Sequence, residues 1–83
     1  MNDLLMGIVV DVMAFLELSG DDVVDPKSAM TWLESISYKL QKLEPGDREA
    51  FLAFVAKRAQ DEEEEQMKEF LRSLPEASGL IEE

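Results

Sequence analysis

The first eighteen residues carry more apolar side chains than a single buried helix face can hold. Twelve of the sixteen residues between Asp3 and Leu18 are apolar. At about 100° per residue they cover an arc of about 200°, whereas a surface helix of a small domain buries little more than ~100°. A helix of this kind needs cover on two sides. The sequence therefore predicts that residues 3–18 form a central core helix, a subunit interface or a partner site.

Amphipathic segments account for nearly all of the chain and predict an all-α fold, a compact bundle of four short helices in one domain of 83 residues. The expected helices are about 3–18, 26–43, 45–59 and 62–74. The apolar faces of the last two segments differ by about 100°, which predicts a break near residues 60–65. Pro75 is expected to end the last helix, so that residues 76–83 form an irregular acidic tail, of which Leu80 and Ile81 can dock on the bundle.

Two aromatic residues of the second segment have different expected environments. Trp32 borders the apolar stripe of that helix and is expected to pack in the core, whereas Tyr38 lies off the stripe and is expected to be exposed. Tyrosine and tryptophan are typical of interface hot spots, so Tyr38 is a candidate contact. Four methionines suit either an adaptable apolar groove or ordinary core packing: Met6, Met13, Met30 and Met67.

The charge of the chain narrows the class of partner. Nineteen acidic and eight basic residues give a net charge of −11. Nucleic acid and anionic membranes repel such a chain, whereas a basic protein is attracted to it. Asn2 and Asp3 stand where a signal peptide needs basic residues, and Asp11 and Glu17 interrupt the apolar segment before it is long enough to span a membrane. The sequence predicts a cytoplasmic protein.

The composition argues against catalysis. The chain has no histidine and no cysteine, and therefore lacks the commonest general base and the strongest nucleophile. It also has no glycine-rich phosphate loop and no nucleophile elbow. We expect a protein that is not an enzyme and that carries no cofactor and no metal site.

The acidic run Asp61–Glu65 is the most conspicuous polar feature. It has two interpretations: a solvated surface whose acids complement a helix dipole, or a docking surface for a basic partner. For docking, the candidate contacts lie in and after the run, in the loop near residue 20 and on the second helix. They are Glu62, Glu63, Glu65, Glu69, Asp21, Asp22 and Tyr38.

The helical patterns over residues 3–74, together with the acidic stretch Asp61–Glu65, resemble those of the small acidic helical immunity proteins that bacteria make beside toxins. This resemblance implies a stoichiometric inhibitor that neutralises a cognate toxin, often a nuclease, by occluding its active site. Electrostatics would then set the association rate, and a few apolar anchors the dissociation rate.

An alternative function is that of a homodimeric adaptor or structural protein. In this alternative, the spare face of the first helix pairs across a two-fold axis through Leu5, Val9, Val12 and Leu16. Mimicry of nucleic acid by the carboxylates is a further alternative, but the acids cluster instead of lining a long edge. An inhibitor can itself be a dimer, so the first two functions are compatible.

Overall fold

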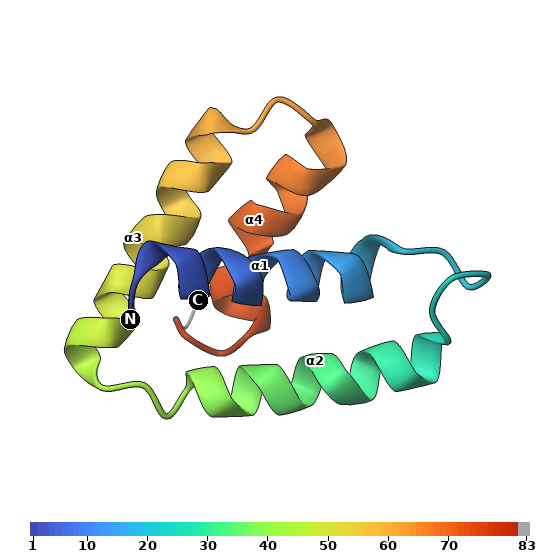
Figure 1. The fold of residues 1–83 in the computed structure, drawn as a ribbon, viewed down its shortest axis with the longest axis horizontal. Coiled ribbons are helices and arrows are strands. Elements are labelled where there is room, and N and C mark those ends of the chain that lie inside the picture. Colours follow the sequence, from blue (N-terminus) through green and yellow to red (C-terminus); the bar gives the residue numbers. More distant parts are fainter. Residues whose placement is uncertain (82–83) are drawn as a thin grey trace.

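The computed structural model describes residues 1–81 and consists of four α-helices. α1 spans Asp3–Leu18, α2 Pro26–Leu40, α3 Pro45–Asp61 and α4 Glu65–Ala77. α1 and α2 form one helical hairpin, α3 and α4 form a second, and α1 packs against all three other helices (Figure 1). The predicted all-α bundle is confirmed, with α1 as its central element.

The starts of the helices follow from local capping chemistry. Asn2 caps α1 by accepting a hydrogen bond from the backbone N–H of Leu5 at 2.8 Å. Asp25 caps α2 in the same way, accepting from the backbone N–H of Ser28 at 3.0 Å, and Pro26 occupies the first helical turn. These side chains satisfy N–H groups that have no partner within the helix.

α2 ends three residues earlier than the predicted boundary at residue 43. Gln41 is the C-cap, and the N–H groups of Lys42 and Leu43 donate to carbonyls three residues back, so the chain tightens into a turn before Pro45. The residue before a proline avoids the helical region, which explains why the helix cannot run into α3. At its other end, α3 extends two residues beyond the predicted 45–59.

The predicted break between the last two helices is confirmed at residues 62–64, but α4 lies three residues later than the predicted 62–74. Glu64 caps α4 by accepting from the N–H groups of Gln66 and Met67. The side chain of Glu62 accepts from the N–H of Glu63 at 3.1 Å and holds the loop. The acidic run therefore supplies the cap that fixes where α4 begins.

The expected end of α4 at Pro75 is wrong, because the helix continues to Ala77. Pro75 has no N–H to donate and its ring crowds the carbonyl four residues back, which disturbs the last turn without ending the helix. Gly79, with φ of 76°, then ends the helix: its N–H donates to the Glu76 carbonyl, and that of Leu80 donates to the Pro75 carbonyl. This is a Schellman motif, which favours glycine at the left-handed position.

The C-terminal segment is only partly the irregular tail that was expected. Residues 76 and 77 are helical, the chain turns at 78–81, and Glu82 and Glu83 lie outside the described residues. Leu80 is buried in the core, whereas Ile81 is exposed. Docking is therefore confirmed for Leu80 alone.

The core lies where the two hairpins meet around α1. Its twelve buried residues come from all four helices and from Leu80: Met6, Val10, Met13, Ala14, Leu40, Phe51, Val55, Ala59, Phe70, Leu71, Leu74 and Leu80. Phe51 and Val10 are 0% exposed. α1 thus places one side in the core and leaves its opposite side uncovered.

Candidate functional site

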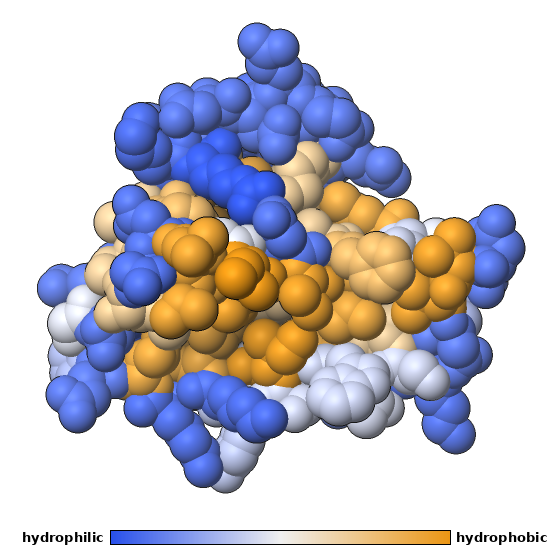
Figure 2. All heavy atoms as spheres, in the orientation of Figure 1, coloured by the Kyte–Doolittle hydropathy of each residue, from blue (hydrophilic) through white to orange (hydrophobic). Residues whose placement is uncertain are grey.

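The uncovered side of α1 is an apolar surface. We call it the α1 face and define it by five large side chains that are between 44% and 73% exposed: Leu4, Leu5, Ile8, Val12 and Phe15. They occupy an arc of about 100° centred on Ile8. Figure 2 shows a continuous hydrophobic area across the middle of the molecule, where α1 lies in Figure 1. Contiguous apolar surface of this kind marks interaction sites in small proteins.

The predicted dimer residues lie only partly on the α1 face. Leu5 and Val12 are exposed, but Val9 and Leu16 are half-buried. Val9 packs against the core, and Leu16 lines a groove beside α2. The exposed surface is therefore rotated by about 60° around the helix axis from the predicted one. Val9 and Leu16 do not belong to it, and its additional members are Leu4, Ile8 and Phe15.

The charges next to the α1 face are paired. Asp11 accepts a hydrogen bond from Arg58 of α3 at 2.6 Å, and the N-terminal ammonium of Met1 lies 3.0 Å from Asp47. Between residues 3 and 18 the chain has no lysine and no arginine. The α1 face is thus an apolar surface with one neutralised carboxylate on its flank.

The acidic candidates divide into two groups. Glu62 is occupied with backbone N–H groups of the loop, as is its neighbour Glu64, which is not one of the candidates. Glu63, Glu65 and Glu69 are exposed and form no ion pair within residues 1–81. The α3–α4 loop that carries the run lies at the opposite end of the second hairpin from α2 (Figure 1).

The remaining candidates do not join the acidic run. Asp21 and Asp22 are exposed in the loop between α1 and α2, well away from the α3–α4 loop in Figure 1. Tyr38 is exposed on α2, with the Lys42 ammonium 4.4 Å from its ring centroid. The seven predicted contacts therefore do not form one surface.

Trp32 is not a core residue. It is 59% exposed, although the sequence places it beside the buried stripe of α2. α2 packs on α1 along a narrow line through Ala29 and Leu40, which are its two buried residues. Because no other helix covers that flank of α2, the indole remains at the surface.

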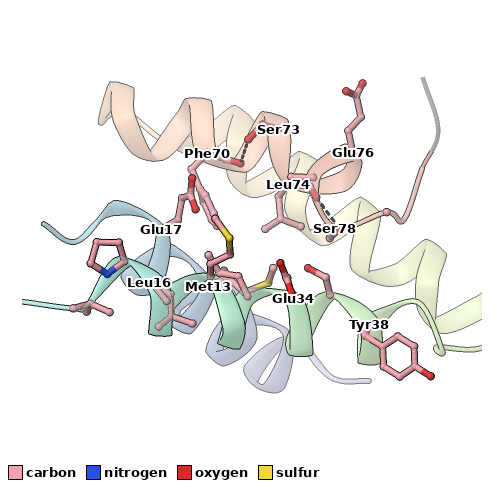
Figure 3. A pocket seen from close by; sticks show the side chains of 18 of the residues that line it. Met13, Leu16, Glu17, Glu34, Tyr38, Phe70, Ser73, Leu74, Glu76 and Ser78 are labelled. Carbon is pink, nitrogen blue, oxygen red and sulfur yellow. Dashed lines mark hydrogen bonds between the residues drawn. The ribbon is translucent and has the colours of Figure 1, made fainter. Parts of the chain in front are cut away.

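A groove of about 760 Å³ lies between α2, the C-terminal part of α4 and the end of α1. Its apolar lining includes Met13, Leu33, Phe70 and Leu74, and Figure 3 shows the last two reaching from α4 towards Met13. At one end, Gln41 Nε2 donates to the Ser78 carbonyl at 2.9 Å and ties α2 to α4. The volume is in the range of binding sites.

The charged residues of this groove are all acidic. Glu17, Asp21, Glu34 and Glu76 line it, and no lysine or arginine does. In Figure 3 the carboxylates of Glu17 and Glu34 lie at the groove, whereas Glu76 points away from α2. Of the earlier candidates, Asp21 and Tyr38 lie here, as do Met13 and Met30, two of the four methionines suited to a groove.

Over residues 1–81, no set of three acidic residues is close enough to hold a metal ion. None of the four helices of that range combines the length and the hydropathy that crossing a bilayer requires. The two surfaces that stand out are the α1 face and the groove.

Comparison with protein-family models, curated proteins and solved structures finds no match to this chain. The resemblance to immunity proteins therefore stays a prediction.

Proposed function

We propose that the protein is a non-catalytic interaction protein that forms a homodimer through the α1 face. The observation that carries this proposal is the run of five exposed apolar side chains on the central helix. A second copy suits this surface because the face itself carries no charge and its flanking carboxylate, Asp11, is already paired with Arg58. The acidic α3–α4 loop lies away from α1, which limits repulsion between two chains of the same charge.

The face is also self-complementary. In an antiparallel pairing, a two-fold axis near residue 10 places Ile8 opposite Val12 of the partner subunit. The same axis places Leu5 opposite Phe15 of the partner subunit. A symmetric dimer needs one patch that fits itself in this way. Burial across this axis covers the side of α1 that the monomer leaves in water, and small domains often gain stability through oligomerisation.

Replacing Ile8 with glutamate is expected to dissociate the dimer without unfolding the chain. Ile8 is 51% exposed at the centre of the face, so a carboxylate is hydrated in the monomer and buried without a partner in the dimer. Sedimentation equilibrium should give twice the 9.4 kDa chain mass for the wild type and 9.4 kDa for Ile8→Glu.

The matched control is Ala53→Glu, which adds the same charge at an exposed position of α3 and should leave the dimer mass unchanged. A monomeric wild type would contradict the proposal. So would an Ile8→Glu variant that keeps native helicity and twice the chain mass.

A second candidate function is inhibition of a basic protein, such as a bacterial toxin met in the cytoplasm, by occlusion of its active site. The acid-lined apolar groove supports this candidate, because it combines apolar anchoring area with carboxylates that attract cationic groups. The exposed acids of the α3–α4 loop would add long-range attraction. Homodimerisation through α1 leaves the groove free, so the two functions are compatible.

A further inference from the structure

The two walls of the groove are helices that present regularly spaced residues. α2 contributes Pro26, Ala29, Leu33, Ser37 and Gln41, which step by three or four residues along its whole length. α4 contributes Phe70, Ser73, Leu74 and Ala77, which lie within an arc of about 100° on one side of that helix. At 1.5 Å per residue, the α2 wall is about 22 Å long, which matches about four turns of a helix.

The floor and the rim have different chemistry. Met13, Phe70 and Leu74 are buried and form an apolar floor, and Leu33 is half-buried beside them. Met30, at 63% exposed, is a flexible apolar side chain on the α2 wall. Glu17, Asp21 and Glu34 are exposed carboxylates at the edges. An occupant must therefore be apolar towards the floor and cationic towards the rim.

We infer that the groove docks one amphipathic helix of a basic protein partner. The helix places apolar residues at i, i+3, i+4 and i+7 against the floor, and its flanking lysines or arginines meet Glu17 and Glu34. Two helical walls receive a third helix by ridges-into-grooves packing. This inference rests on the second candidate function, for which it names the site and the kind of segment bound.

A second copy of this chain is a poor occupant. The α1 face of a second copy would bring no cationic side chain to the rim, because residues 3–18 contain no lysine and no arginine. The carboxylates of the rim would then have no cationic partner. Charge complementarity therefore selects a basic helix from another protein.

The test uses a fluorescent leucine–lysine peptide of about four helical turns as the probe, with binding read by anisotropy. Glu17→Lys combined with Glu34→Lys should weaken binding about tenfold or more, because both carboxylates lie on the groove. Glu63→Lys combined with Glu65→Lys makes the same change of net charge off the groove and should weaken binding less than about threefold. Ser37→Trp, which narrows the groove without changing charge, should also weaken binding.

Each of these results would overturn the groove as the site: equal losses of affinity in the two double variants, equal binding of a scrambled peptide, amide shifts of isotope-labelled protein confined to α1, or no binding of the probe. If only the Glu63→Lys, Glu65→Lys variant loses affinity, the basic-partner function stands and the groove assignment is wrong. If the probe does not bind the wild type, the basic-partner function is contradicted as well. The mass measurement on the α1 dimer is independent of all these results.

Discussion

Replacing Phe51 with alanine is expected to lower the free energy of unfolding by about 3–5 kcal/mol. Phe51 is 0% exposed and lies on α3 in the core cluster that joins the four helices. Its removal loses the transfer free energy of a phenyl ring and leaves a cavity that well-packed neighbours fill only in part. A domain of 83 residues has roughly 4–12 kcal/mol of stability in total, so the loss is a large fraction of it.

Urea unfolding followed by circular dichroism measures this loss. Phe15→Ala is the control, because it makes the same change on the α1 face, where the ring is 54% exposed. At protein concentrations low enough to keep the chain monomeric, Phe15→Ala should lower the free energy of unfolding by less than about 1 kcal/mol. Similar losses for the two variants would mean that the core is not organised around Phe51.

Substitution by aspartate is expected to have opposite effects on folding at two valines of α1 that are two positions apart. Val10 is 0% exposed, whereas Val12 is 44% exposed. Val10→Asp buries a carboxylate for which the core offers no cationic partner, and such a group costs several kcal/mol. We therefore expect Val10→Asp to unfold the protein. Val12→Asp should keep native helicity and lose the dimer.

Far-UV circular dichroism and sedimentation of the same samples separate the two effects. A folded Val10→Asp variant together with an unfolded Val12→Asp variant would show that Val12, and not Val10, faces the core. This pair tests the orientation of the helix without reference to any partner.

The four-helix fold is predictable from the sequence because its signals are local. Asp25-Pro26 and Glu44-Pro45 place the starts of two helices, and the mismatch of apolar faces after residue 59 locates the break. The end of α4 depends on Gly79, a helix-stop signal that Pro75 obscures in the sequence. Gly79 followed by Leu80 is the sequence signature of a Schellman cap with its apolar contact, and it indicates a helix that passes Pro75.

The orientation of α1 is not predictable from its own composition. Its apolar arc of about 200° fits the core in several rotations, and the choice depends on where α2, α3 and α4 lie. Gly7 lies on the side of α1 that meets α3, where a Cβ added to it would be in ordinary van der Waals contact with the Phe54 ring at 3.8 Å. An apolar surface on α1 is therefore predictable from the sequence, whereas the position of its centre at Ile8 depends on how the other helices pack.

The groove is a tertiary feature and has no continuous sequence signal. Its lining comes from α1, the following loop, α2 and α4, so that Glu17, Glu34 and Phe70 are distant in sequence. Asp21 and Tyr38 were candidates for reasons of charge and exposure. The acidic run is more conspicuous in the sequence because its residues are consecutive, yet Glu62 and Glu64 accept hydrogen bonds from backbone N–H groups.

The most direct test of the α1 dimer is an isotope-filtered NOE measurement on an equal mixture of labelled and unlabelled protein. It detects only contacts between two copies of the chain. The proposed dimer should give intermolecular NOEs among the methyl groups of Leu5, Ile8 and Val12, and between Leu5 and the Phe15 ring of the partner subunit. Intermolecular NOEs confined to another helix, or none from α1, would contradict it.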